Sequence, residues 1–518
     1  MRLLHLVQHL AWSYQSGGFL AAAARSSAVH RVGVVFAAGV LVGAGLWLLR
    51  FARGGHAGEI TAAIWFHHGR TPVARTLGRA VLSIVTVGMG SALGREGALK
   101  HAGGLAGAEI AALARLTAPQ RRLLTACGVG AGMAAAYNLP LGGPLFALEV
   151  LLGSISLPLA APALACGALA TAVSWAFLPI RPIYLTPAYA ISGAELGWAL
   201  AAGPIIGAFA ALYVRVIAWA DRRAPRSAAG RLAAPMAAFL ALGAVSIVLP
   251  QLLGNGIDVV QRSFLDQAGP VWLTLSLAFA RMAASAMCLG AGAPGGLFTP
   301  TMTCGALLGG GLGRLWTDVA PAAGTDPGAC AVIGAGAMLA AATEGPMSAV
   351  VSVLELGQRI DLAIVPVAIA AAGAVIVARL LGSPSIYSAR VRQGAAQAQL
   401  RRKDAPAPFA GFDPDYRSIS SGARAAAAAE ALLEGGDAPV YVVDEAGRLV
   451  GALSARKLAA CKPAPLELMT ANDLADPVAT ISAASSPQQA KAALRRSGAG
   501  EIGVTDGRGE RLIGTLRR

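Results

Sequence analysis

The stretch "GSALGREGALKH", residues 90–101, places a carboxylate among glycines and apolar residues. Glycine-rich turns at the start of helices expose backbone N–H groups, and a helix N-terminus carries about half a positive charge, so such turns bind anions. A carboxylate inside a membrane segment indicates a functional site. We therefore predict that Glu96 acts as a gate: its ionised carboxylate occupies the anion site, and the neutral acid leaves it. The alternative is a structural ion pair of Glu96 with Arg95 or Lys100.

Three pairs of segments repeat along the chain at one spacing. Setting Gly94 on Gly296 aligns the glycine turn of "GREG" with that of "GGLF". A second alignment sets Glu149 on Glu355, and a third sets "GGHAGEI" on "GNGIDVV". All separations are about 200–206 residues, which indicates a duplicated membrane domain. Helices broken at matching positions of two halves predict a binding site where the halves meet.

The composition is that of a polytopic membrane protein. The chain is 55% hydrophobic and only 13% charged, whereas soluble domains carry about 25% charged residues. Several apolar segments are too short to cross a bilayer, and glycine or proline interrupts them. We therefore expect an all-α fold with an inverted internal repeat and broken helices that stop inside the membrane. The net charge of +15 comes from arginines scattered between apolar segments. That scatter differs from the basic stripe of a nucleic-acid-binding protein, which excludes this class.

The sequence offers little support for catalysis or metal binding. The six cysteines form no CxxC pair, and we expect reduced, buried thiols. His67 and His68 have no partner motif, so no metal site is predicted. An intramembrane hydrolase using Glu96 or His101 would need a metal-ligand pair or a nucleophile beside a base, and neither spacing is present. The chain is therefore not expected to be an enzyme.

The chain divides into a membrane part and a soluble part. We expect a membrane domain over 1–395 with halves of about 1–190 and 191–395, a linker over 396–415, and a soluble tandem of α/β modules over 416–518. The soluble part and the arginine-rich loops predict a cytoplasmic C-terminus. Residues 1–15 match only the end of the predicted helix 193–220, so we expect that the first membrane helix is truncated.

Four motifs carry a family resemblance. They are "GREGA" (94–98), "YNLPLGGPLFALE" (137–149), "GGLFTP" (295–300) and "SPSIYSA" (383–389). In this order they resemble the CLC family of chloride channels and chloride/proton exchangers, over nearly all of 1–395. The C-terminal part is similar to a tandem of cystathionine-β-synthase-type (CBS) domains. The resemblance implies a voltage-gated type of bacterial chloride channel in the inner membrane, a homodimer with one pore per subunit, and small anions and the lipid bilayer as its partners.

The resemblance also implies an anion site. Glu96 matches the family's gating glutamate, and a central chloride would be held by the amides of Leu297 and Phe298 and the hydroxyl of Tyr387. The family's serine hydroxyl corresponds to Gly55, or to His56 if the alignment slips by one, so preference for chloride over nitrate stays open. No full positive charge is expected at the site, because a lysine would hold chloride too tightly to conduct. The candidate anion-binding residues are Gly55, Gly94, Arg95, Gly97, Leu297, Phe298 and Tyr387.

Val150 bears on the mechanism. Exchangers of the family typically carry a second glutamate directly after the position of Glu149, and here that position is Val150, which cannot relay a proton. We therefore expect passive chloride conduction, with chloride/proton exchange as the alternative. Glu355 is expected to be structural, either capping amides or pairing with Arg359.

The soluble tandem leaves two roles open. By resemblance, nucleotide binding uses an acidic residue near the end of each CBS module, where this chain has Lys457. Adenine-nucleotide binding and a dimerising or regulatory role without ligand are both retained. No other cofactor is expected besides chloride as the bound and transported ion.

Overall fold

The structure is a computed structural model of the chain. It describes residues 2–517 with these gaps: 15–16, 53–58, 190, 226, 359–362, 391–415, 436–438, 454, 461–467, 484, 486, 498–500 and 507–509. Gly55 and His56, Arg359, Cys461 and the predicted linker 396–415 therefore lie outside the described residues.

The chain forms two compact units. The first unit comprises Met1–Ile60, Thr71–Ala114 and Leu124–Arg390. The second unit comprises Thr61–Arg70, Arg115–Leu123 and Val391–Arg518. Two short segments of the N-terminal half thus belong with the C-terminal region rather than with the helices around them in sequence.

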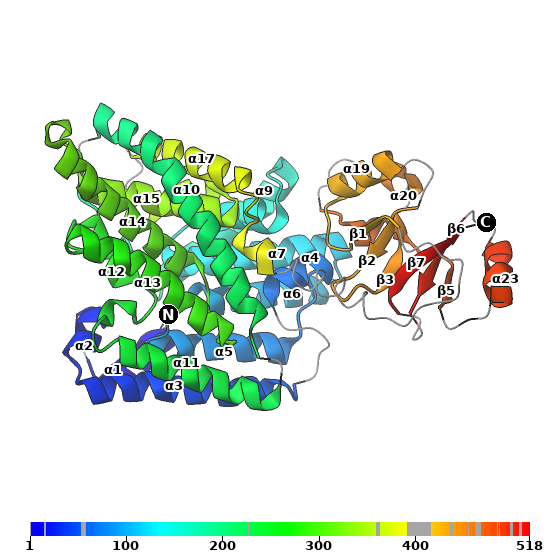
Figure 1. Cartoon of the computed structure of the whole chain (residues 1–518), viewed down its shortest axis with the longest axis horizontal. Helices are drawn as coiled ribbons and strands as arrows, with labels where there is room; N and C mark the ends of the chain where they lie inside the picture. The colour runs from blue at the N-terminus through cyan, green and yellow to red at the C-terminus, as the bar shows by residue number, and fades with distance from the viewer. Residues whose placement is uncertain are drawn as a thin grey trace. The chain divides into compact units, whose positions relative to one another are not determined.

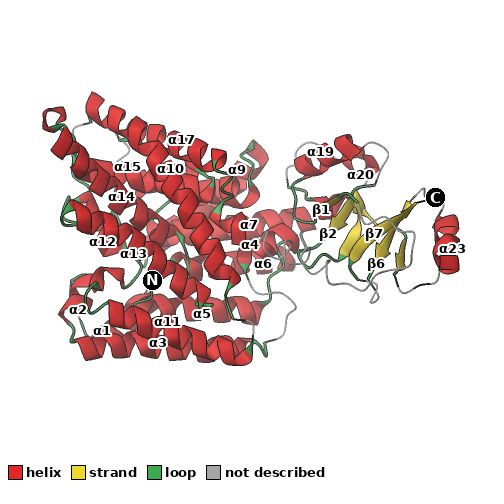
Figure 2. Ribbon diagram, in the orientation of Figure 1, coloured by secondary structure: helices red, strands yellow, loops and turns green. Residues whose placement is uncertain are grey.

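The first unit is helical, as the composition predicts (Figures 1 and 2). Its first half contains α1 (Arg2–Trp12), α2 (Phe19–Arg25), α3 (Ala28–Leu49), α4 (Ile60–Phe66), α5 (Val73–Gly88), α6 (Glu96–Leu113), α7 (Ala118–Tyr137), α8 (Gly142–Phe146), the π-helix η1 (Ala147–Leu152) and α9 (Leu157–Trp175). Its second half contains α10 (Gly193–Arg222), α11 (Ala228–Val245), η2 (Pro250–Leu252), α12 (Ile257–Phe264), α13 (Val271–Gly290), α14 (Phe298–Val319), η3 (Pro321–Ala323), α15 (Pro327–Thr343), α16 (Pro346–Gly357) and α17 (Ile364–Leu380). All of α4 except Ile60 belongs to the second unit, and so does the start of α7 up to Leu123.

Only some of these helices have the length of a membrane span. Five described helices, α3, α9, α10, α11 and α13, are long and apolar enough to cross a bilayer by length and composition. Other apolar helices, such as α15 and α16, are shorter than a span. This mixture agrees with the prediction of helices that stop inside the membrane.

Glycines let the two sequence repeats pack closely. A Cβ on Gly39 of α3 would clash with the backbone of Pro235, and one on Gly43 would clash with Leu232. Both partners lie in α11, which is the repeat counterpart of α3, and the two helices run side by side in Figure 1. The absence of side chains at these glycines permits backbone-to-backbone contact.

A close contact between two helices at a pair of glycines occurs in each half. In the first half, a Cβ on Gly103 of α6 would overlap the carbonyl of Gly128 in α7. In the second half, a Cβ on Gly305 of α14 would overlap the carbonyl of Gly334 in α15. Gly103 and Gly305 are the two residues that the repeat alignment pairs. The glycines therefore position α6 and α14, the helices that begin at Glu96 and Phe298.

The second unit contains the strands (Figure 2). Its elements are β1 (Ser418–Ser420), α19 (Ala425–Gly435), β2 (Tyr441–Val443), β3 (Leu449–Leu453), α20 (Ala455–Ala460), α22 (Ala471–Leu474), β4 (Ala475–Asp476), β5 (Thr480–Ser482), α23 (Pro487–Ser497), β6 (Glu501–Thr505) and β7 (Leu512–Arg517). The sheets have the orders β1-β2-β3-β4 and β5-β6-β7. Each begins with a parallel pair followed by an antiparallel pair, so the β-α-β-β order occurs twice.

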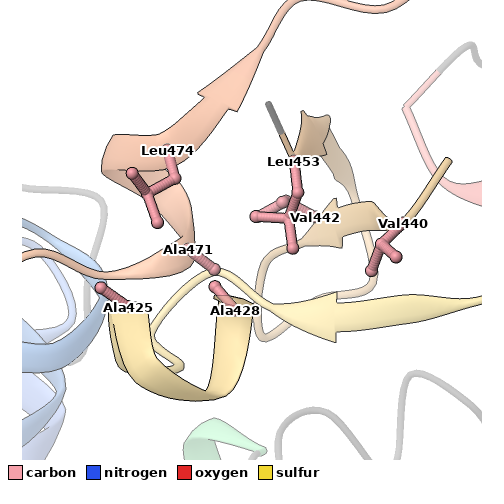
Figure 3. Close-up of a cluster of buried hydrophobic side chains, with 7 residues drawn as sticks. All are labelled: Ala425, Ala428, Val440, Val442, Leu453, Ala471 and Leu474. Atoms are coloured by element: carbon pink, nitrogen blue, oxygen red, sulfur yellow. The ribbon is translucent and has the colours of Figure 1, made fainter. Parts of the chain in front are cut away.

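The first of these modules has a small apolar core (Figure 3). Its buried members are Ala425, Ala428, Val440, Val442, Leu453, Ala471 and Leu474. Alanines on α19 allow the helix to lie close to the strands, because a small side chain keeps the separation short.

An ion-paired cluster lies beside this core within the second unit. The guanidinium of Arg122 donates to Asp473 Oδ2 at 3.0 Å and to the Thr470 hydroxyl at 3.2 Å. The His68 ring lies 3.2 Å from Asp473 Oδ1. Burial alone would raise the pKa of Asp473, but the bond with His68, the charge of Arg122 and the amide of Thr470 together hold it well below its usual range.

Candidate anion site

Two glycine turns from the two repeats meet at the centre of the first unit. Gly94 and Gly296 form a reciprocal pair of backbone hydrogen bonds, each 2.8 Å from N to O. The sequence alignment sets these same two glycines on each other. Residues related by the repeat therefore touch, as expected for a two-fold relation between the halves. The helix starts that follow, Glu96 and Phe298, are brought together by this contact.

The Glu96 carboxylate lies at the N-terminus of α14. It is fully buried, and its Oε1 accepts hydrogen bonds from the amides of Phe298 at 2.6 Å and Thr299 at 3.3 Å. Its Oε2 accepts from the hydroxyls of Tyr137 at 3.0 Å and Thr299 at 3.1 Å. A helix N-terminus favours negative charge, so the carboxylate holds a position that suits an anion.

The glycines around this carboxylate leave room for it. A Cβ on Gly94 or on Gly296 would overlap the carboxylate of Glu96. A Cβ on Gly97 would clash with the backbone of Gly295. These positions accept no larger residue without moving the carboxylate or separating the two turns.

The amides at the start of α14 bind the Glu96 carboxylate in this structure. The Phe298 amide donates to the Glu96 carboxylate together with that of Thr299, whereas a role of Leu297 and Phe298 in holding a central chloride stays a prediction. Leu297 directly precedes α14 and lines a cavity of about 20 Å³ with Gly97 and Tyr387. Gly55, the remaining predicted ligand, lies outside the described residues.

Tyr387 belongs to an aromatic wall beside the site. Its buried ring packs edge-on against Phe146 with centroids 5.6 Å apart, and Phe146 packs edge-on against Phe298 at 6.5 Å. The Tyr387 ring is therefore packed against an apolar wall, which limits its motion.

Lys100 corrects one expectation from the sequence. The site was expected to lack a full positive charge, yet the Lys100 ammonium donates to the Tyr387 hydroxyl at 3.2 Å and lies 4.4 Å from the centre of that ring. Lys100 is only 7% exposed, and none of the described carboxylates lies within ion-pair distance of it. Glu59 lines the same small cavity without reaching ion-pair distance of Lys100, so the buried ammonium still favours an anion beside it.

Arg95 is buried but does not touch the Glu96 carboxylate. Its guanidinium lies 4.4 Å from the centre of the Tyr137 ring. Among the described residues, its Nε and Nη2 atoms have no hydrogen-bond partner. The alternative of a structural ion pair between Glu96 and Arg95 or Lys100 is therefore not what the structure shows.

Val150 and its neighbours form a second symmetric arrangement. Glu149 accepts from the amides of Met347 at 3.1 Å and Ser348 at 2.7 Å, at the start of α16. Glu355 accepts from the amides of Leu141 at 3.0 Å and Gly142 at 2.7 Å, at the start of α8. Each glutamate thus caps the helix of the other half.

These caps account for both glutamates. Glu355 caps amides, which is one of its two expected roles, while Arg359 lies outside the described residues. Glu149 is held in the same way. Val150 is buried in η1, with an apolar side chain at the predicted relay position.

Two residues of the site were missed by the sequence interpretation. Tyr137 and Thr299 both bind Glu96 Oε2, and their hydroxyls lie 3.0 Å from each other. Both stand inside the motifs "YNLPLGGPLFALE" and "GGLFTP", so a hydroxyl in each motif was the available signal.

Comparisons with known proteins agree with this architecture. A sequence model described as the voltage gated chloride channel matches residues 35–379. The chain is 32% identical over 343 residues to a putative chloride channel protein ClcB-like from Ralstonia nicotianae, covering 64% of this chain and 78% of that protein. It is 29% identical over 334 residues to the H(+)/Cl(-) exchange transporter ClcA from Vibrio cholerae, covering 62% and 70%. The solved structure of a slow cyanobacterial Cl-/H+ antiporter is similar at a TM-score of 0.65 and 23% identity, covering 75% of this chain and 91% of that one.

Proposed function

This chain belongs to the voltage-gated chloride channel family, and from that premise we propose that it exchanges chloride for protons across a membrane, with Glu96 as the group that couples them. The family consists of ion channels and transporters rather than enzymes, in agreement with the sequence prediction. Exchange was the alternative to the passive channel expected from Val150. The ClcA relative, which is named as an exchanger, supports this alternative better than the passive channel.

The proposal rests on one observation, the position of the Glu96 carboxylate on the amides that begin α14. In its ionised form the side chain competes with chloride for the same donors, because both are anions at a helix N-terminus. Protonation removes its charge and hence most of its attraction to these amides. Chloride then replaces the carboxyl group, so one proton is bound when the site opens to the anion.

The hydroxyls around Glu96 support a protonated state. Glu96 Oε2, the Tyr137 hydroxyl and the Thr299 hydroxyl form a triangle with sides of 3.0–3.1 Å. The two hydroxyls supply one proton each, so with Glu96 ionised one side of the triangle lacks a hydrogen. A proton on Oε2 supplies it. The triangle therefore accommodates both charge states of Glu96, as a coupling group requires.

A passive channel remains the second candidate, and Val150 favours it. The side chain carries no titratable group, and the neighbouring Glu149 is occupied as a helix cap. In an exchanger of this kind, protons would reach Glu96 without a carboxylate at position 150.

The test is proton movement driven by a chloride gradient in proteoliposomes. Under exchange, an outward chloride gradient drives protons inward, and Glu96→Gln abolishes this uptake while anion flux continues. Glu109→Gln, an exposed position on the same helix α6, serves as the matched control and should keep the coupling. Chloride flux that moves no protons in the unmodified protein would instead establish the passive channel.

Further features of the family are carried over as proposals. We propose a homodimer with one pore per subunit in a bacterial inner membrane, and a cytoplasmic C-terminal tandem of CBS type. The two β-α-β-β modules support the tandem. Lys457, at the position where an acidic residue would hold ribose, lies 2.8 Å from Asp476 in the same module. This pairing favours a regulatory or dimerising role over adenine-nucleotide binding there.

A further inference from the structure

A cavity of the first unit lies apart from Glu96. Its volume is about 360 Å³, and it is bounded by the ends of α3, α10 and α13, the starts of α5 and α11, and Arg390. Its charged lining residues are Arg50, Arg75, Arg79, Arg231, Arg390 and Asp221. We call this cavity the arginine chamber.

The chamber carries more positive than negative charge. Arg390 pairs with Asp221 at 3.3 Å, and Arg79 lies 3.9 Å from Glu59. Among the described residues, arginines therefore outnumber the carboxylates beside this cavity. The repulsion among these like charges is offset when an anion lies between them.

Several guanidinium groups of the chamber have N–H donors that are available to an anion. The Arg390 Nε atom is buried and has no hydrogen-bond partner in the described part of the chain. Arg231 makes no side-chain hydrogen bond or ion pair with any described residue. Arg50, at the exposed rim, is held by its contacts with the rings of Trp47 and Phe51, at 5.1 and 4.3 Å from their centres. A stacked guanidinium keeps its N–H edges available.

The chemistry of the chamber differs from that of the Glu96 site. Guanidinium groups present planar pairs of N–H donors that match the oxygens of a phosphate group, whereas chloride has no such geometry. The volume also exceeds what one chloride ion needs. We propose that the arginine chamber binds a phosphate group, either that of a soluble phosphate or that of a lipid headgroup.

The chamber adjoins the site of transport. Arg79, Leu289, Ala293 and Arg390 line both the chamber and the smaller cavity that contains Lys100 and Tyr387. A phosphate group in the chamber therefore lies at one entrance to the anion site. From that side it inhibits transport. This inhibition rests on the proposed function, whereas the binding itself does not.

Binding is tested by isothermal titration of the full chain in detergent with pyrophosphate and with orthophosphate, at constant low chloride. Both should bind, pyrophosphate more tightly. Arg231→Gln and Arg50→Gln should each weaken pyrophosphate binding by about tenfold or more, because each removes a charge-assisted contact. Pyrophosphate binding that is absent, or unchanged in both variants, would overturn the proposal.

The matched control is Arg262→Gln, an exposed arginine of α12 that does not line the chamber. It should bind pyrophosphate like the unmodified protein. Equal weakening in this control would show a general charge effect and would also overturn the site. Thermal unfolding midpoints of all variants establish that lost binding does not reflect a lost fold.

Two reconstitutions identify the source of the phosphate group. In vesicles of phosphatidylcholine, pyrophosphate should slow chloride flux from one side of the membrane, and this inhibition should be lost in Arg231→Gln. Addition of phosphatidic acid to the vesicles distinguishes the sources: a weaker apparent affinity for pyrophosphate assigns the chamber to a lipid headgroup, and an unchanged affinity assigns it to a soluble phosphate. If pyrophosphate binds but flux is insensitive to it, the inhibition is wrong and the site stands. If no chloride flux occurs at all, the proposed function fails while the titrations still decide the binding.

Discussion

At the scale of single residues, the site combines one predicted group with several that sequence patterns do not single out. Glu96 was identified because a carboxylate among glycines is conspicuous. Tyr137 and Thr299 are distant from it in sequence, and a hydroxyl is unremarkable in an apolar segment. Lys100 lies one helical turn after Glu96, so helix geometry places both on one face. Its contact with Tyr387 depends on how the C-terminal part of the membrane unit packs.

We expect Tyr137→Phe to shift the pH dependence of transport. The change removes one hydrogen bond to the carboxylate, and bonds to charged groups are worth about 1.5–3 kcal/mol. With the carboxylate less stabilised, the pH of half-maximal flux should rise by about one unit or more. The measurement is chloride flux from proteoliposomes as a function of pH.

Tyr184→Phe provides the control for this change. Tyr184 is equally buried, and its hydroxyl has no hydrogen-bond partner among the described residues. Its pH profile should match that of the unmodified protein. A Tyr137→Phe profile that overlays the control would remove Tyr137 from the site.

We expect Lys100→Met to weaken anion binding. None of the described carboxylates lies within ion-pair distance of the buried Lys100 ammonium, so its charge should attract a permeating anion. The chloride concentration for half-maximal flux should rise by about tenfold or more. Lys100→Arg keeps the charge and should largely restore the affinity. The same half-saturating chloride concentration in the unmodified protein and both variants would contradict this role.

At the scale of elements, the repeat determines how helix ends are completed. Sequence alignment paired the glycine turns correctly, because glycines and prolines mark helix breaks in the sequence itself. It did not show that Glu149 and Glu355 would each cap the opposite half. These reciprocal caps form only when the two halves are packed together. No local sequence pattern reveals that packing.

We expect Glu149→Gln and Glu355→Gln to destabilise the protein to a similar extent. Each replaces a charged cap of two amides by a neutral one, at a cost of about 1–2 kcal/mol. The measurement is the thermal unfolding midpoint in detergent, with Glu109→Gln as an exposed control. Proton coupling should persist in Glu149→Gln. Loss of coupling without loss of stability would show that Glu149 carries protons instead.

At the scale of the whole molecule, composition and hydropathy predicted a helical membrane unit and a C-terminal α/β region, and both are present. The assignment of Thr61–Arg70 and Arg115–Leu123 to the second unit was not predicted. The apolar composition of a segment does not indicate which unit it packs in. The assignment depends on contacts such as that between Arg122 and Asp473, which are 351 residues apart.

We expect Asp473→Asn to destabilise the second unit by about 3 kcal/mol at neutral pH, because it leaves the buried Arg122 without its carboxylate. The low pKa of Asp473 means that its contribution is present above its ordinary pKa of about 4 and is lost as the pH falls below that value. Hydrogen exchange of the amides in Ala471–Leu474 measures this local stability in the full chain. The difference between variant and unmodified protein should shrink on acidification below about pH 4, and a difference that grows would contradict the assignment.

The reciprocal caps of Glu149 and Glu355 have a consequence for the ancestry of the chain. A protein of half this length could pair with an inverted copy of itself, and one glutamate per chain would then complete both exposed helix starts. The paired glycines at positions 94 and 296 would be a single glycine in such an ancestor, meeting its own copy. Gene fusion would have preserved every one of these contacts while freeing the two copies to diverge. Glu96 and Phe298 are aligned by the repeat but differ in chemistry, as such divergence would allow.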